Sequence, residues 1–185
     1  MVWVVRLIFV LLVAALSIRV EVGSIPEGAP HFRVAAENGD AFAQAQLGQH
    51  YLLNGTDDEG RELAIYWLER AASQDEGQAI YLLGVLREQG MYGAIAALPF
   101  YLKAARLNNA PAQERLAQLF ASSELGRPNY TESYKWYLLV TRHGGDFGLD
   151  DFGAGRHLSP AQKAMAQQAA NFIAAAFTGR DVPAS

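Results

Sequence analysis

Apolar and polar residues between positions 43 and 72 follow the spacing of two amphipathic helices. In the first segment one face collects small and large apolar residues together with one histidine: Ala43, Leu47, His50 and Tyr51. In the second segment one face collects Ala64, Trp67, Leu68, Ala71 and Ala72. A glycine-marked acidic turn joins the two segments, which predicts a helical hairpin. Because an isolated hairpin cannot bury both of its faces, we expect the pattern to recur.

The pattern recurs twice further along the chain. Leu47-Gly48 returns as Leu83-Gly84 and then, less closely, as Leu116-Ala117, so the small residue stands at positions 48, 84 and 117, which are 36 and 33 residues apart. The second segment returns as small–aromatic–small spacing that begins at Ala97 and again at Ser133. Spacing that is constant within helices and varies only in the loops is typical of stacked hairpins. The sequence therefore predicts an all-α solenoid of about three hairpins rather than an unrelated alanine-rich bundle.

These residues resemble the Sel-1-like repeat, a relative of the tetratricopeptide repeat, over roughly residues 33–146. The first copy is near-complete, with Ala43, Leu47, Gly48, Tyr51, Gly55, Ala64, Trp67, Ala71 and Ala72 at the expected positions. The later copies depart from the pattern at Arg87, Phe100, Ala117, Phe120 and Val140-Thr141. The resemblance implies a curved right-handed superhelix that works as a protein-binding scaffold, and it implies no activity.

The N-terminal residues 1–24 carry a targeting or anchoring signal. Leu7 to Ile18 is apolar apart from Ser17, and a run of about 10–14 residues is typical of a signal-peptide core. Including Val2 to Val5 lengthens the run to a marginal span with Arg6 inside it. A cleaved signal peptide and an uncleaved membrane anchor both stay open. In either case we expect the repeat domain to lie outside the cytoplasm, in the periplasm or anchored to the cytoplasmic membrane.

Two further segments flank the repeats. Residues 25–32 read as a linker with two prolines and a glycine, followed by a half-hairpin helix that Gly39 stops before Asp40 caps the next helix. Residues 147–185 read as an acidic glycine-rich loop and a capping helix that starts at Ser159-Pro160. Its predicted core stripe is Ala164, Ala169, Phe172, Ile173, Ala176 and Phe177.

Three local features of the repeats also give expectations. Pro99 falls inside a predicted helix, which it should kink or restart unless it lies in the first turn. Asn129 or Thr131 should cap the last helix of the third hairpin. The helix Gln78 to Gln89 carries more apolar residues than one core can take, so part of its surface is a candidate groove for a partner.

Charge and candidate chemistry argue against catalysis. The net charge of −4 provides no basic field for nucleic acid, and the absence of cysteine excludes disulfides, thiolate zinc sites and a catalytic cysteine. His50 has no second metal ligand at helical spacing, and the acids Asp57, Asp58, Glu59 and Glu62 lack calcium-loop spacing and suit a helix cap. We read the pair Asp150-Asp151 as surface. The sequence thus predicts no catalytic residue, cofactor or metal. A cell-wall-directed hydrolase is an alternative function, but the sequence contains no set of residues that would catalyse hydrolysis.

A partner-binding strip can be placed on the first helix of each hairpin. In tetratricopeptide-like solenoids these helices line the concave face, and the positions off the core stripe here are Gln46, Gln49, Leu53, Leu82, Val85, Gln89, Arg115, Gln118 and Ser122. Amide and aliphatic side chains suit a peptide or helix partner. We therefore expect a protein–protein interaction scaffold of the bacterial cell envelope. A carbohydrate-binding role in polysaccharide assembly is the alternative, for which Tyr134, Trp136 and Tyr137 would have to form an exposed platform.

Overall fold

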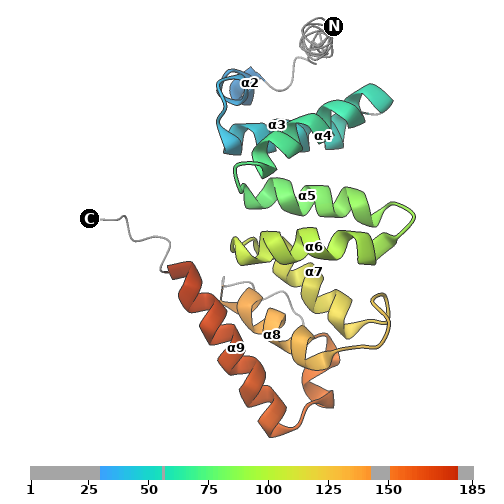
Figure 1. Ribbon diagram of the computed structural model, residues 1–185, viewed down its shortest axis with the longest axis vertical. Helices are drawn as coiled ribbons and strands as arrows, with labels where there is room; N and C mark the ends of the chain where they lie inside the picture. The colour runs from blue at the N-terminus through green and yellow to red at the C-terminus, as the bar shows by residue number, and fades with distance from the viewer. Residues whose placement is uncertain (1–29, 56, 143–150, 179–185) are drawn as a thin grey trace, which may run out of the picture. The chain divides into compact units, whose positions relative to one another are not determined.

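The computed structural model describes residues 30–55, 57–142 and 151–178, and apart from Pro30, the first residue of α2, all features below lie in the unit that begins at His31. Its described residues form eight α-helices and one 3₁₀ helix and contain no strand (Figure 1). In chain order these are α2 (Pro30–Glu37), α3 (Ala41–Asn54), α4 (Asp58–Ala72), α5 (Gly77–Glu88), α6 (Gly93–Arg106), α7 (Ala110–Ala121), α8 (Tyr130–Thr141), η1 (Asp151–His157) and α9 (Pro160–Thr178).

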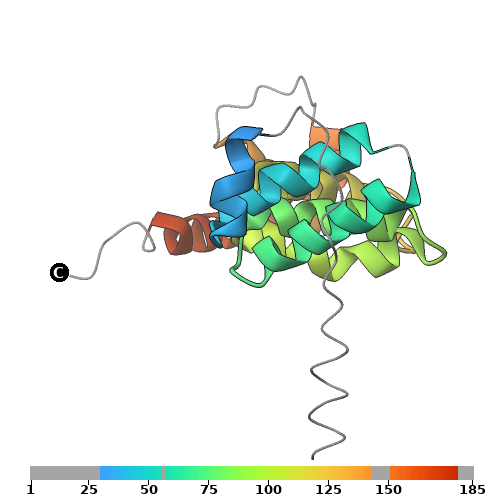
Figure 2. The same ribbon diagram turned by 90° about the horizontal axis from the view of Figure 1, so that it is seen from above.

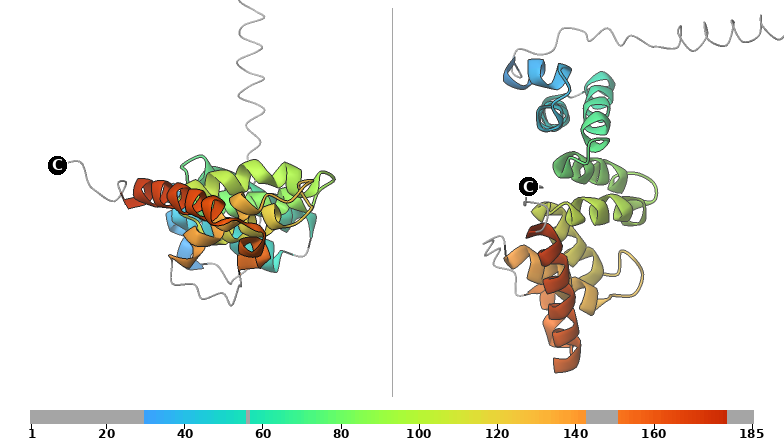
Figure 3. Two further views of the ribbon diagram at one scale, coloured as in Figure 1. Left: turned by 90° about the horizontal axis from the view of Figure 1, so that it is seen from below. Right: turned by 60° about the vertical axis from the view of Figure 1, so that its left-hand side comes forward.

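Helices α3 to α8 form three hairpins that stack in chain order. The pairs α3–α4, α5–α6 and α7–α8 pack within hairpins, while α4 packs on α5 and α6 packs on α7 between hairpins. Helix α9 packs on α8, and η1 contacts both α7 and α8. The side view in Figure 3 follows the pairs one after another, and the view from above in Figure 2 shows them overlapping. The predicted all-α stack of three hairpins is confirmed, and its handedness stays a prediction.

Small residues let the two helices of each hairpin approach closely. A Cβ atom added at Gly48 would lie 2.7 Å from Cγ of Leu68, and one added at Gly84 would lie 2.8 Å from the ring of Tyr101. In the third hairpin the buried Ser133 hydroxyl donates to the carbonyl of Ala117 at 2.8 Å. The repeated small residue at positions 48, 84 and 117 therefore marks the closest approach between partner helices. In the second hairpin, Tyr101 is the fully buried aromatic and Phe100 packs beside the core.

Most of the helix boundaries follow from their capping residues. Gly39 has a φ of 100° after α2, and the next helix starts with the Asp40 carboxylate accepting a hydrogen bond from Ala43 N at 2.7 Å. Asn129, rather than Thr131, caps α8, as its side chain accepts from Glu132 N at 3.2 Å. Ser159 and Gln162 form a reciprocal capping box at the start of α9. These caps confirm the predicted starts of α3, α8 and α9.

Pro99 does not restart its helix. It lies in the second turn of α6, which is continuous from Gly93 to Arg106. Proline removes the hydrogen bond to the carbonyl four residues earlier, which belongs to Ile95. Both Pro99 and Ile95 are exposed, so water can satisfy that carbonyl. The predicted restart was wrong because the missing bond falls on the solvent side of the helix, and a kink at Pro99 stays a prediction.

The predicted core stripe of α9 was also wrong in part. The fully buried residues are Ala166 and Ala170, with Ile173 and Phe177 packed beside them. Phe172, which the stripe placed in the core, is exposed. Alanines rather than a phenylalanine face α8, because small side chains allow the two helices to approach closely.

Several sequence-based expectations lie outside the described residues. They include the apolar run Leu7 to Ile18, the first residues of the linker, and Asp150. Among the described residues, no helix is both long enough and apolar enough to cross a bilayer. The C-terminal glycine-rich segment, which was predicted as a loop, contains the short helix η1.

Candidate interaction groove

A hollow of about 410 Å³ lies where the first two hairpins meet. Its walls come from the C-terminal half of α3, the first turn of α4 and the outward side of α5. The lining residues are Gln49, Tyr51, Leu52, Leu53, Gly55, Asp57, Asp58, Arg61, Leu82, Val85, Leu86 and Gln89. We call this feature the groove. Its size falls within the range of ordinary binding sites for small ligands and side chains.

Two glycines hold the α3–α4 turn at the mouth of the groove. A Cβ atom added at Gly60 would lie 2.6 Å from Cα of Gly55, and one added at Gly55 would lie 2.8 Å from Cα of Gly60. The two backbones therefore touch directly, which only glycine permits at this distance. The same turn places Asp57 at the start of α4, where its carboxylate accepts from Gly60 N at 2.8 Å. The turn thus fixes the acidic residues of the groove.

The groove has an apolar floor and a charged mouth. Leu52, Leu82, Val85 and Leu86 are half-buried, so their side chains remain partly open to solvent. Asp57, Asp58 and Arg61 are exposed at the mouth, and Gln49 and Gln89 contribute amides along the wall. A surface of this kind can bury apolar side chains of a partner while the amides hydrogen-bond to its backbone.

The hydroxyl of Tyr51, which lines the groove, has no hydrogen-bond partner within the described part of the chain. The Tyr51 side chain is almost fully buried, and burial is the main cause that raises its pKa above the ordinary value. A buried hydroxyl without a partner costs about 1–3 kcal/mol. This hydroxyl is closed off from the groove, so it is an unpaired internal polar group and not a contact that the groove offers to a partner.

Five of the nine residues predicted for partner binding come together in this groove: Gln49, Leu53, Leu82, Val85 and Gln89. Gln46 is half-buried on α3 and does not line it. The sequence pattern assigned Tyr51 to the core face and made no prediction of a groove contact for Leu52 or Leu86. It also missed Asp57, Asp58 and Arg61, which join the groove only because the first turn of α4 packs beside the end of α3. No periodicity within one helix signals that neighbourhood.

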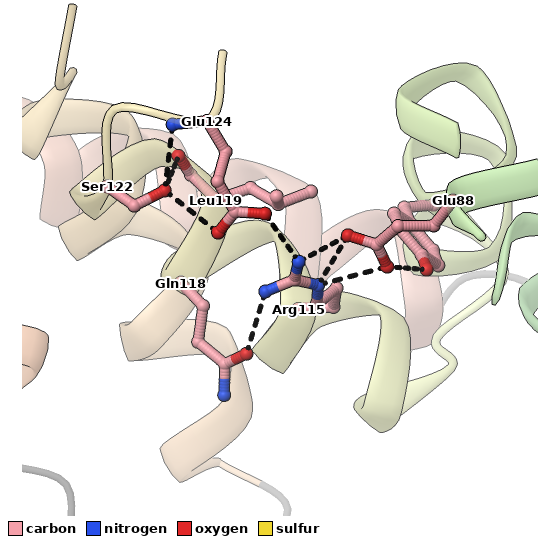
Figure 4. A network of polar contacts seen from close by, with 7 residues as sticks. Glu88, Arg115, Gln118, Leu119, Ser122 and Glu124 are labelled. Carbon is pink, nitrogen blue, oxygen red and sulfur yellow. Dashed lines mark hydrogen bonds and ion pairs between the residues drawn. The ribbon is translucent and has the colours of Figure 1, made fainter. Parts of the chain in front are cut away.

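The three predicted residues of the third hairpin belong instead to a polar network (Figure 4). The Arg115 guanidinium donates to the Glu88 carboxylate, to Glu124 at 2.8 Å and to the amide oxygen of Gln118 at 3.3 Å. The Ser122 hydroxyl donates to Glu124 and to a backbone carbonyl of α7. Arg115 is thus held by partners within the chain, and the network ties the second hairpin to the third.

Electrostatics of the network follow from its partial burial. Burial alone would raise the pKa of Glu88, but hydrogen bonds from Arg115 and Tyr101 outweigh it and lower the pKa. The hydrogen bond with Glu88 is the main cause that raises the pKa of Arg115. Burial, followed by the Glu88 carboxylate, raises the pKa of Tyr101, whose hydroxyl donates to Glu88 at 2.6 Å. Glu88 is therefore the anionic centre that both neighbours stabilise.

The structure also describes other residues that the sequence singled out for candidate chemistry. His50 is half-buried beside Tyr51, and its Nδ1 atom lies 3.2 Å from the amide nitrogen of Asn54. Within the described ranges no three potential metal-ligating residues of the His, Cys, Asp and Glu types gather together. Trp136 is only 2% exposed and so cannot contribute to an open platform for a sugar, while Tyr134 and Tyr137 are half-buried and stack on each other.

Comparisons with known proteins agree with this architecture. The Sel1 repeat model matches residues 41–76, 77–109 and 110–144, which together span more than half of the chain. A solved structure with an SLR fold, c5321, a protective antigen of uropathogenic Escherichia coli strains, has a TM-score of 0.68 at 23% identity. The similarity covers 85% of this chain and 36% of that one, and at this identity it shows the fold alone.

Two curated relatives match part of this chain. DAP3-binding cell death enhancer 1 from Rattus norvegicus is 37% identical over 89 residues, and its Mus musculus counterpart is 39% identical over 90. Each match covers 46% of this chain but only 17% of the relative's length. The three matched repeats coincide with α3–α4, α5–α6 and α7–α8, and the chain therefore belongs to the Sel1 repeat family.

Proposed function

We propose that this protein is a non-catalytic scaffold that binds an apolar segment of a partner protein in the groove between its first two hairpins. The observation that carries the proposal is the groove itself, with a half-exposed aliphatic floor that no other described element covers. Apolar side chains left open to solvent in a hollow of this size favour a bound partner. The proposal that the protein has no catalytic activity rests on its membership of the Sel1 repeat family, whose repeats form interaction surfaces.

The chemistry of the groove indicates how a segment would be held. Leu82, Val85 and Leu86 would bury its apolar side chains, while Gln49 and Gln89 would hydrogen-bond to its backbone. Gln46, Arg115, Gln118 and Ser122 stay predicted contacts of a larger surface.

We also propose that this scaffold works in the bacterial cell envelope. The support is the apolar run in residues 1–24, which suits a signal peptide or an anchor of the cytoplasmic membrane with the repeats outside the cytoplasm. A protein partner agrees with the name of the mammalian relatives, which states that they bind DAP3. Because this chain spans only 17% of those proteins, DAP3 itself is not carried over.

Affinity capture with matched variants tests the groove. The full-length chain would be used as bait beside Leu53→Glu, which adds a charge at a groove residue that is 75% exposed. Ile95→Glu is the control, since Ile95 is 67% exposed on α6 and lies outside the groove. We expect a partner that is retained by the unmodified chain and the control but lost from Leu53→Glu. Equal retention by all three baits, or no specific partner for the unmodified chain, would contradict the proposal.

A further inference from the structure

Helix α9 has two apolar faces, and the described structure covers only one of them. The inner face packs on the last hairpin through the buried Ala166 and Ala170. The outer face carries Met165 and Phe172, which are 66% and 79% exposed. Together with Ala169 and Ala176 they form a stripe at helical spacing. An apolar stripe on a second face indicates a further packing partner.

A hollow accompanies this outer stripe. It measures about 480 Å³ and lies between α8 and α9, where it is lined by Lys135, Met165, Gln168, Ala169, Phe172 and Ile173. Phe172 thus projects beside an open space rather than into the core. The outer face therefore has both a projecting side chain, Phe172, and a hollow that could receive one. A surface that binds a copy of itself requires both features.

The charge of this face limits what can cover it. No charged residue occurs between positions 164 and 178. Lys163 lies 6.0 Å from the ring of Tyr134, while Lys135 pairs with Glu132 and lies over the ring of Trp136. The Arg142 guanidinium also reaches α9, where it donates to the side chain of Asn171. A charged partner would find no counter-charge along the stripe, and an anionic membrane surface would need a row of basic residues beside it. A second face without charge is the best electrostatic match.

We propose that the outer face of α9 binds the same face of a second copy of this chain. In an antiparallel pair with a two-fold axis beside Ala169, Met165 of one copy lies opposite Phe172 of the other. Each Phe172 then enters the hollow beside the other α9, and Ala169 lets the helices approach at the axis. A contact built on one helix of about 28 Å buries a modest area, so the dimer dissociates on dilution.

Cross-linking tests this geometry directly, because the chain contains no cysteine. Ala169→Cys in the full-length chain, in mild detergent, places one thiol next to its two-fold mate. Only cysteines whose Cα atoms lie within about 7 Å can form a disulfide. We expect oxidation to give a linked dimer with Ala169→Cys and little product with Glu62→Cys, an exposed control on α4. Equal yields from the two variants would overturn the proposal.

Analytical ultracentrifugation of matched variants gives a second readout. Met165→Glu and Phe172→Glu add a charge to the stripe, while Met91→Glu and Tyr92→Glu add one to exposed apolar residues just before α6. We expect the α9 variants to weaken dimerisation at least tenfold with unchanged helical content, and the controls to behave as the unmodified chain. A monomer at every concentration, or a dimer that survives the α9 substitutions, would overturn the proposal. Neither result bears on the groove, which lies in other repeats.

Discussion

Arg115, in the middle of α7, forms an ion pair with the carboxylate of Glu88, at the end of α5. Its Nε atom lies 3.1 Å and 3.2 Å from the two carboxylate oxygens, and a terminal guanidinium nitrogen makes a further bond to the same group. The two side chains are only 25% and 21% exposed, and they belong to successive hairpins. This ion pair fixes the second hairpin against the third.

Removing the charge of Glu88 should destabilise the stack. Glu88→Gln keeps the size of the side chain but loses the charge-assisted bonds to Arg115, which should lower the free energy of unfolding by about 1.5–3 kcal/mol. Urea denaturation followed by circular dichroism measures this. Glu124→Gln is the matched control, since Glu124 is 46% exposed and its bond to Arg115 should contribute less than about 1 kcal/mol. Equal losses of unfolding free energy in the two variants would show that the Glu88–Arg115 pair stabilises the fold no more than the exposed Glu124–Arg115 pair does.

The same carboxylate should give the stability an acid dependence. The pKa of Glu88 is lowered from 4.5 in the folded state, so the unfolded chain binds its proton more readily. The stabilisation from Glu88 is therefore complete above about pH 4.5 and is lost as the pH falls through the lowered folded pKa. Unfolding measured between neutral pH and about pH 3 should show a steeper loss for the unmodified chain than for Glu88→Gln.

Comparison with that variant also removes an opposing effect. Burial is the main cause that raises the pKa of Glu76, so this residue alone would favour the folded state at lower pH. Glu76 is present in both proteins, and its contribution cancels in the difference. Parallel acid profiles for the two proteins would refute the assigned role of Glu88.

Two glycines of one helix should respond oppositely to alanine. At Gly84 a new Cβ would lie 2.8 Å from the ring of Tyr101, which is buried and hydrogen-bonded to Glu88. At Gly77, in the first turn of α5, the nearest atom would be 3.5 Å away. We expect Gly84→Ala to destabilise by about 1–3 kcal/mol and Gly77→Ala to be neutral or slightly stabilising. Thermal unfolding of both variants checks this, and similar shifts in melting temperature would contradict it.

The glycine contact at the groove mouth should couple stability to binding. Gly60→Ala places a Cβ atom 2.6 Å from Cα of Gly55, so the α3–α4 turn must open. We expect a loss of about 1–3 kcal/mol in stability together with weaker capture of the partner, because the turn positions Asp57 and Asp58. Hydrogen exchange should show faster exchange in residues 52–62. Unchanged exchange in these residues would contradict the prediction, because it would mean that the turn accommodates the methyl group without opening.

The repeat architecture could be predicted from sequence because its signal is local. Each repeat carries a small residue, at positions 48, 84 and 117, and an aromatic residue further along. Within each helix the apolar residues follow helical spacing, which can be read from that helix alone. Caps such as Asp40 and Asn129 act within three residues of their own position. Patterns that involve only residues close together in the chain can be recognised from the sequence alone.

Other features depend on which elements meet. The helical wheel placed Arg115 off the core stripe, but its main partner Glu88 lies 27 residues earlier in the chain. The wheel likewise placed Phe172 on the core stripe of α9 and left out Ala170, because periodicity within one helix does not show which side will pack on α8. The sequence predicted only a helix cap for the acidic turn, and the packing of α4 beside α3 and α5 makes this turn part of a groove as well.

Site-specific photo-crosslinking in the native host tests the central claim most directly. A photoreactive amino acid would replace Leu53 or Gln89 in the groove, or Ile95 and Arg70 at exposed positions outside it. We predict that the two groove positions give the same adduct of defined mass, which is absent at the two outer positions. Adducts that are equal at all four positions, or confined to the outer pair, would contradict a partner-binding groove between the first two hairpins.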